Sequence, residues 1–280
     1  MNPKPKKTLP RRLPTKDSMY AFYLADPVSK AIERELDRTR LRYSYLDSEL
    51  RCKTQSKEVL NGCLLSGKAI LEYGGSSSDL GRFDMFFIPP EKTLRIKPQE
   101  SETRSKICFV SSPSVRKVDA DFEIQRFGFD KFTHQGEIGS DRKMSTYRTN
   151  WTAIKNGFFM SGFTQIPDYS LKQGVVTSVN LEKDKEGELE ISSHIHPNIP
   201  EVHIYCISDK KTAVTQYLIS PEGSSICRDL TDGEGAFFPG NLGHMNFVRP
   251  TYRNVAYCLY MWVMPTYGKT DYVKPVPLNT

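Results

Sequence analysis

Short apolar runs separated by turn residues dominate the chain after about residue 40. In the first half they cover residues 62–73 and 85–88, and Gly74-Gly75 and Pro89-Pro90 mark the turns that follow. In the second half the candidate strands cover residues 175–181, 189–194, 202–208, 212–219, 236–238 and 255–264. Alternation with a period of two and closely spaced turns are typical of antiparallel strands. The pattern predicts an all-β fold of two strand-rich halves, each a sandwich or barrel.

One segment near the N-terminus has a helical period instead. Asp26 suits the cap of a helix and Pro27 its first turn. The apolar residues that then recur every four positions are Val28, Ile32 and Leu36. This spacing predicts one short N-terminal helix over residues 27–40.

Charge divides the chain into segments. Residues 1–16 contain six basic residues, four prolines and no acidic residue, which accounts for the whole net charge of +6. We expect this segment to be a disordered basic tail, and the neutral remainder gives no reason to expect nucleic-acid binding. The predicted domains are a first half with the leading helix over residues 17–125, a linker over 126–165 and a second half over 166–280.

Neither a membrane span nor a secretion signal is visible. No window approaches the roughly 18 consecutive apolar residues of a membrane helix, and the N-terminus lacks an apolar signal stretch. The six cysteines are scattered without a CxxC pair, so we expect them to be reduced. The sequence predicts a cytoplasmic protein.

Four residues have the spacing of a metal site. His194 and His196 lie two apart, so they share one face of a strand; Glu201 follows after a short turn, and His244 follows the turn that begins at Pro239-Gly240. Each histidine alone would be an ordinary polar residue at a strand end. Together, three imidazoles and one carboxylate are a ligand set for a divalent metal that leaves room for a substrate oxygen.

These motifs resemble those of the 5-keto-4-deoxyuronate isomerase family of the cupin superfamily. Its members carry HxHxxxxE, a strand, and a Pro-containing turn with a last histidine, and the likeness extends over about residues 171–264. It continues in Ala256-Tyr257 and in 261–264, Met-Trp-Val-Met, although Val263 replaces a family glycine and the segment from Pro265 differs. The resemblance implies a bicupin in which the first half is a second cupin without metal histidines, in line with the absence of histidine before His134.

The resemblance also implies an enzyme, an intramolecular oxidoreductase that interconverts aldose and ketose forms of a deoxy-keto-uronate or a similar acidic sugar. Zinc is the implied cofactor, and the ligand set would also accept iron, manganese or nickel. A divalent cation can stabilise the oxyanion of the enediol that forms during such an isomerisation. Two alternatives remain: a cupin Fe(II) dioxygenase, and a non-catalytic sugar-binding bicupin.

Candidate acid–base residues lie on the strand of Glu201. Glu201 directly precedes the strand predicted over residues 202–208. His203 and Tyr205 follow it at intervals of two residues, so all three share one face and would point into the same cavity. His203 is a candidate acid or base, with Tyr205 and Tyr260 as its candidate partners. The alternative is a structural histidine within a polar core.

An acidic substrate would need a cationic partner besides the metal. The basic residues nearest in sequence to the predicted metal site are Arg142, Lys143 and Arg148. Arginine suits bidentate carboxylate recognition, although a solvated charge cluster is an equal reading. We further expect a homo-oligomer, because the strands near 202–206 and 255–264 are apolar on both faces.

Overall fold

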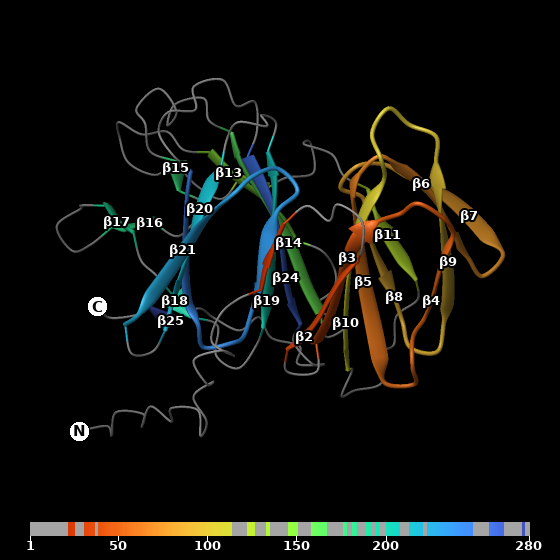
Figure 1. Ribbon diagram of the computed structural model, residues 1–280, viewed down its shortest axis with the longest axis horizontal. Coiled ribbons are helices and arrows are strands. Elements are labelled where there is room, and N and C mark those ends of the chain that lie inside the picture. Colours follow the sequence, from red (N-terminus) through yellow and green to blue (C-terminus); the bar gives the residue numbers. More distant parts are fainter. Residues whose placement is uncertain are drawn as a thin grey trace.

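The structure is a computed structural model, shown in Figure 1. It describes residues 22–25, 31–36, 39–113, 122–126, 133–134, 145–150, 158–166, 176–177, 181–183, 189–191, 194–195, 200–207, 213–220, 223–248, 258–265 and 276–277. Within these residues every regular element is a strand, so the predicted all-β class is confirmed. None of the described residues forms a helix that could cross a membrane.

The N-terminal half is a sandwich of two antiparallel sheets (Figure 1, orange to yellow). Over the described residues, the six-stranded sheet has the order β11-β8-β5-β10-β3-β2, and the sheet that faces it has the order β4-β9-β6-β7. The strands are β2 (Ile32–Leu36), β3 (Thr39–Tyr45), β4 (Leu50–Lys53), β5 (Glu58–Ser66), β6 (Lys68–Tyr73), β7 (Ser76–Leu80), β8 (Met85–Ile88), β9 (Thr93–Gln99), β10 (Lys106–Pro113) and β11 (Glu123–Gln125).

The C-terminal half has the same two-layer plan (Figure 1, green to blue). As far as the structure describes it, one sheet runs β1-β22-β19-β24-β14-β13-β12 and the other β21-β20-β23-β18-β25, with β15 beside β23 and a separate β16-β17 hairpin. The strands are β1 (Phe22–Leu24), β12 (Thr133–His134), β13 (Ser145–Asn150), β14 (Phe158–Ile166), β15 (Val176–Thr177), β16 (Leu181–Lys183), β17 (Leu189–Ile191), β18 (His194–Ile195), β19 (Glu201–Ile207), β20 (Val214–Ile219), β21 (Ser225–Leu230), β22 (Gly235–Phe238), β23 (Gly243–Val248), β24 (Cys258–Pro265) and β25 (Val276–Pro277).

The two halves are structural repeats of each other. The central order β8-β5-β10-β3-β2 of one sheet corresponds to β22-β19-β24-β14-β13 of the other. The turns that enter β8 and β22 also match, because the amide of Leu64 donates to the carbonyl of Asp84 (3.0 Å) as that of Tyr205 donates to Glu234 (2.8 Å). This equivalence gives each position in one sandwich a counterpart in the other, and the chain is a bicupin.

A continuous apolar cluster joins the two halves. Val202 and Ile204 of β19 and Phe237 of β22 pack with residues of the N-terminal sheet that include Tyr43 and Met85. Because these β19 residues are covered within the chain, the apolar faces no longer argue for a second subunit on that side. The predicted homo-oligomer stays a prediction.

Polar contacts between the halves lie at the edge of this cluster. The hydroxyl of Tyr43 donates to the carbonyl of Gly233, and Arg82 reaches Asp232 at 3.0 Å. Arg82 and Asp232 occupy equivalent positions in the two repeats, two residues before Asp84 and Glu234, so the turns of the two halves face each other.

The predicted helix over residues 27–40 is wrong. Its described part forms a hairpin of β2 and β3, in which Ile32 lies opposite Tyr43 and Leu36 opposite Thr39. Ile32 and Leu36 pack against the apolar cluster between the halves. A spacing of four residues fits one face of a strand as well as one face of a helix, and here the tertiary contacts select the strand. Asp26, Pro27 and Val28 lie outside the described residues.

The segment over residues 126–165, predicted as a linker, contains strands. β13 and β14 pair with each other, and β14 pairs with β24, so both extend the C-terminal sheet. The N-terminal strand β1 joins the same sheet through β22 and buries Leu24 completely. The C-terminal sheet is therefore built from three separate parts of the chain.

Other strand predictions match closely. β8 occupies the predicted 85–88, and β19, β20, β22 and β24 lie within one or two residues of most predicted bounds. The turn after β6 has Gly74 and Gly75 at φ values of 57° and 85°. Two consecutive positive φ values define the tight hairpin turn that glycines favour, as the sequence indicated.

Candidate metal centre

Alternation along β19 brings two polar residues into the interior of the C-terminal sandwich. Val202 and Ile204 face the N-terminal half, so Glu201 and His203 face the opposite way. Both are 1% exposed. His244 of β23, from the opposing sheet, is 2% exposed and reaches the same point.

The three side chains form one compact group. Nε2 of His203 lies 3.2 Å from Oε2 of Glu201, and Nε2 of His244 lies 3.7 Å from the same oxygen. One donor atom from each residue lies within 4.8 Å of the other two. Two imidazole nitrogens and a carboxylate oxygen converging in a buried place are a donor set that suits a divalent transition metal.

The other ring nitrogens are also engaged. Nδ1 of His203 lies 3.2 Å from Nε2 of the buried Gln216 on β20, and Nδ1 of His244 lies 3.4 Å from the carbonyl of Leu242. The Phe238 ring packs on both imidazoles at centroid distances of 4.9 and 5.1 Å. Such partners fix the orientation of a ring and leave Nε2 directed at the shared point, as metal-binding histidines require.

The N-terminal repeat lacks this donor set. Leu60 pairs with Ile88 as Glu201 pairs with Phe238, so leucine stands in place of the carboxylate. Leu94 stands likewise in place of His244, since each follows by three residues a turn residue with positive φ, Glu91 in one half and Asn241 in the other. At these two positions the first cupin therefore has leucine where the second has Glu201 and His244.

Gly62 is the counterpart of His203 and shows how the space is filled. A Cβ atom on Gly62 would lie 2.0 Å from the ring of Phe86, so this ring occupies the room that a larger side chain would need. In the C-terminal repeat the residue opposite His203 is Ala236. The Gly–Phe pair of one half and the His–Ala pair of the other fill similar volumes with opposite polarity.

Of the predicted metal ligands, the structure brings Glu201 and His244 together. The backbone of His194 on β18 lies directly opposite that of His244, and His196 lies outside the described residues. His203, predicted as an acid or base, contacts Glu201 directly. The predicted pairing of His203 with Tyr205 or Tyr260 stays a prediction.

The remaining predicted site residues are placed only in part. Tyr205 is buried on β19, and the backbone of Tyr260 on β24 lies directly opposite it. Arg148 belongs to β13, opposite Phe163 of β14. Arg142 and Lys143 lie outside the described residues.

Sequence reasoning did not find Gln216 and Phe238. Gln216 lies on a predicted strand, but a lone glutamine carries no spacing that links it to a distant histidine. Phe238 precedes the Pro-Gly turn and reads as an ordinary core residue. The only available signal was the polar Gln216 between Thr215 and the apolar end of β20.

Comparison with known proteins supports the fold. No family model and no curated protein matches this chain. Among solved structures, an IolB-like protein from Salmonella typhimurium LT2 is similar with a TM-score of 0.55 and 10% identity, over 88% of this chain and 93% of that one. AerE from Microcystis aeruginosa has a TM-score of 0.53 and 10% identity, over 87% and 98%. Ylba from E. coli has a TM-score of 0.53 and 8% identity, over 85% and 82%. The likeness spans both halves and shows the cupin fold.

Proposed function

We propose that this chain is a metal-dependent ketol-isomerase acting on a deoxy-keto-uronate or a similar acidic sugar. The observation that carries the proposal is the buried group of Glu201, His203 and His244 in one cupin, with apolar residues at the equivalent positions of the other. A buried carboxylate is costly unless it is paired or bound to a cation. Its retention here favours a functional centre over a structural one.

In the proposed centre, Glu201 and His244 hold the metal together with His194 and His196. Zinc is the proposed metal, with iron, manganese or nickel as alternatives. When bound, a divalent cation would supply positive charge for the developing oxyanion of an enediol. The burial of Glu201 and His244 keeps water away from this charge and strengthens the interaction.

His203 is the proposed proton carrier. An aldose–ketose shift removes a proton beside a carbonyl and returns it to the neighbouring carbon, which one imidazole can do. Gln216 and Phe238 hold the His203 ring so that Nε2 faces the centre. Tyr205 and Tyr260 remain proposed partners, and Arg142, Lys143 and Arg148 remain proposed contacts of the sugar carboxylate.

A substrate panel tests the function. Purified protein is assayed on keto-uronates and on matched neutral ketoses, with and without a chelator, while metal content and oxygen consumption are measured. Uronate isomerisation that stops on chelation supports the proposal. Oxygen consumption by an iron-loaded protein would instead indicate a dioxygenase, and metal binding without turnover would indicate a sugar-binding bicupin.

The His203→Gln variant tests the division of roles. If His203 carries the proton, the variant keeps its metal and loses turnover by about a hundredfold or more. Metal loss in this variant would instead make His203 a ligand, because it lies as close to Glu201 as His244 does.

The Arg142→Ala variant tests the proposed contact with the sugar carboxylate. It should raise KM for the uronate by a factor that corresponds to about 1.5 to 3 kcal/mol, without changing KM for the neutral ketose.

A further inference from the structure

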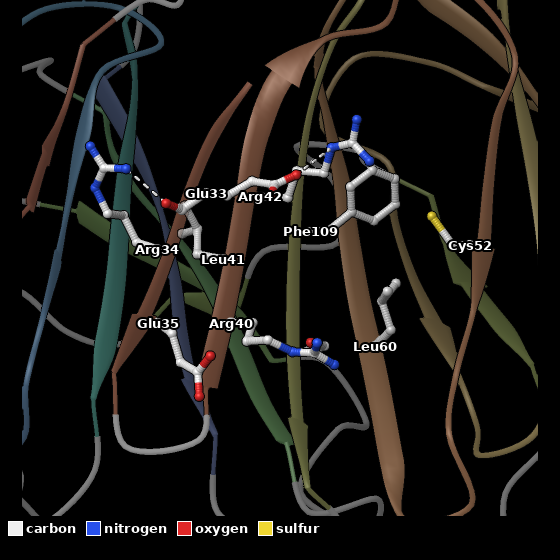
Figure 2. Close-up of a pocket in the computed structure, with 10 residues that line it drawn as sticks. Glu33, Arg34, Glu35, Arg40, Leu41, Arg42, Cys52, Leu60 and Phe109 are labelled. Carbon is white, nitrogen blue, oxygen red and sulfur yellow. Dashed lines mark hydrogen bonds and ion pairs between the residues drawn. The ribbon is translucent and has the colours of Figure 1, made fainter. Parts of the chain in front are cut away.

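A cavity lies in the N-terminal sandwich, far in sequence from the candidate metal centre. Its volume is about 410 Å³, and strands β2, β3, β5 and β10 of one sheet and β4 of the other contribute to it (Figure 2). Its apolar wall includes Leu60 and Phe109, which belong to the core of this half. The cavity therefore opens from between the two layers of the sandwich.

The cavity lies beside the position that the candidate metal centre occupies in the other repeat. Leu60 is the counterpart of Glu201, as shown above. Cys52 lies opposite Leu94 on β4, as His194 lies opposite His244 on β18, so Cys52 is the counterpart of His194. The first cupin thus has leucine and cysteine where the other repeat has Glu201 and His194, with an opening beside them.

Two arginines of β3, Arg40 and Arg42, are among the polar groups that line this opening. Arg40 and Arg42 alternate with Leu41, which faces the apolar cluster between the halves, so both point to the cavity side of β3. In Figure 2 both side chains extend toward the side where Leu60, Phe109 and Cys52 lie. Ser111, opposite Arg40 on β10, adds a hydroxyl to the lining.

The nearby carboxylates do not use all the hydrogen-bond donors of the Arg42 guanidinium. Its Nε is buried and has no hydrogen bond among the described residues, and its ion pair with Glu33 is long at 3.6 Å. Arg40 pairs with Glu58, Arg34 donates to the backbone carbonyl of Glu33, and Glu35 is exposed. Although the Arg42 side chain is 41% exposed as a whole, its Nε–H is buried, so an oxygen bound in the cavity would give this donor an acceptor.

We infer that this cavity binds a small anion through Arg40 and Arg42, with a carboxylate or phosphate group on the guanidinium side and an apolar or sugar-like body against Leu60 and Phe109. Planar guanidinium groups donate two parallel hydrogen bonds to either oxyanion. The charge of Arg42 also reaches Cys52, whose pKa burial raises to about 11 while Arg42 opposes the rise. The first cupin would then serve as a ligand-binding domain beside the proposed metal centre.

Protection of Cys52 from alkylation tests this inference. The full-length protein, treated with chelator so that no metal competes for the anion, is reacted with iodoacetamide at increasing inorganic phosphate or glucuronate. Sodium chloride of equal ionic strength serves as the reference. Peptide mass spectrometry gives the rate at Cys52, and the exposed Cys227 reports any general change in reactivity.

The inference predicts that one of the two anions slows alkylation of Cys52 but not of Cys227. The anion that acts at the lower concentration identifies the group that the site prefers. Arg42→Gln and Arg40→Gln should each raise the half-protecting concentration about tenfold or more, whereas Arg51→Gln should leave it unchanged. Arg51 is a matched control, because it precedes Cys52 on β4 and is exposed.

Two results would overturn the inference. One is the absence of protection by either anion up to about 10 mM, a concentration that even weak binding would reveal. The other is equal protection in the wild type, Arg40→Gln and Arg42→Gln. Protection is expressed as a ratio of rates with and without anion, so a change in the reactivity of Cys52 itself does not affect it. If Arg42→Gln fails to fold, Arg40→Gln and Arg42→Lys still decide the outcome.

Discussion

Gln216 is the described polar side chain that engages the outer nitrogen of the His203 ring. It is fully buried, and its Nε2 lies 3.2 Å from Nδ1 of His203. If His203 is the proposed proton carrier, Gln216→Ala should lower kcat about tenfold with KM and metal content unchanged, because the ring loses its orientation.

Thr215→Val provides the control for this change. Thr215 lies on the opposite face of β20, where its hydroxyl contacts Asp229 at 2.6 Å. Its variant should keep the wild-type kcat. Steady-state kinetics and metal analysis measure both variants, and a wild-type kcat in Gln216→Ala would remove Gln216 from the mechanism.

At the residue scale, sequence reasoning could name candidates only where spacing carried information. Glu201, His203 and His244 could be selected because strand alternation and the Pro-Gly turn constrain where such residues lie. Gln216 could not, since its contact with His203 depends on which strands face each other across the sandwich. That pairing joins residues with no common local pattern.

At the scale of elements, β19 and β22 determine the position of the candidate ligands. They approach closely at Gly235, where an added Cβ would lie 2.1 Å from the backbone oxygen of His203. Gly235→Ala should therefore force the strands apart, destabilise the protein by several kcal/mol and weaken metal binding. Urea unfolding and metal titration measure the two effects.

Gly81→Ala, in the turn that leads into β8 of the first half, is the control. Its added Cβ would meet only an oxygen of Asp84, at an ordinary 3.7 Å. The stability and the metal affinity of Gly81→Ala should therefore stay near those of the wild type. Unchanged stability and metal affinity in Gly235→Ala would show that the close approach of these strands does not matter for the centre.

Strands could be predicted where turn residues mark their ends. The prediction failed where the spacing of apolar residues fits both a helix and a strand. Ile32 and Leu36 lie four residues apart, a spacing that helices and strands share, and only their packing on the inter-half cluster selects β2. Strands β13 and β14 were missed because charged and polar residues dilute their alternation. Their pairing with each other and with β24 is long-range information.

For the whole molecule, the N-terminus contributes to the distant half. Strand β1 pairs with β22, and Leu24 is completely buried in the cluster that joins the halves. Deletion of residues 1–25 should lower the free energy of unfolding by about 2 kcal/mol or more through the loss of this side chain alone. Deletion of residues 1–16, the predicted basic tail, should leave stability unchanged. Thermal and urea unfolding compare the two deletion variants. Equal stability of the 1–25 and 1–16 deletions would contradict the role of β1.

The metal content of a double variant tests the central claim most directly. The wild-type protein should bind about one divalent ion per chain, as should His134→Ala, whose histidine lies on β12 at the edge of the sheet. Glu201→Ala combined with His244→Ala should bind none, because both residues supply donor atoms to the same buried point. Full occupancy in a folded double variant would contradict the account and place the metal elsewhere.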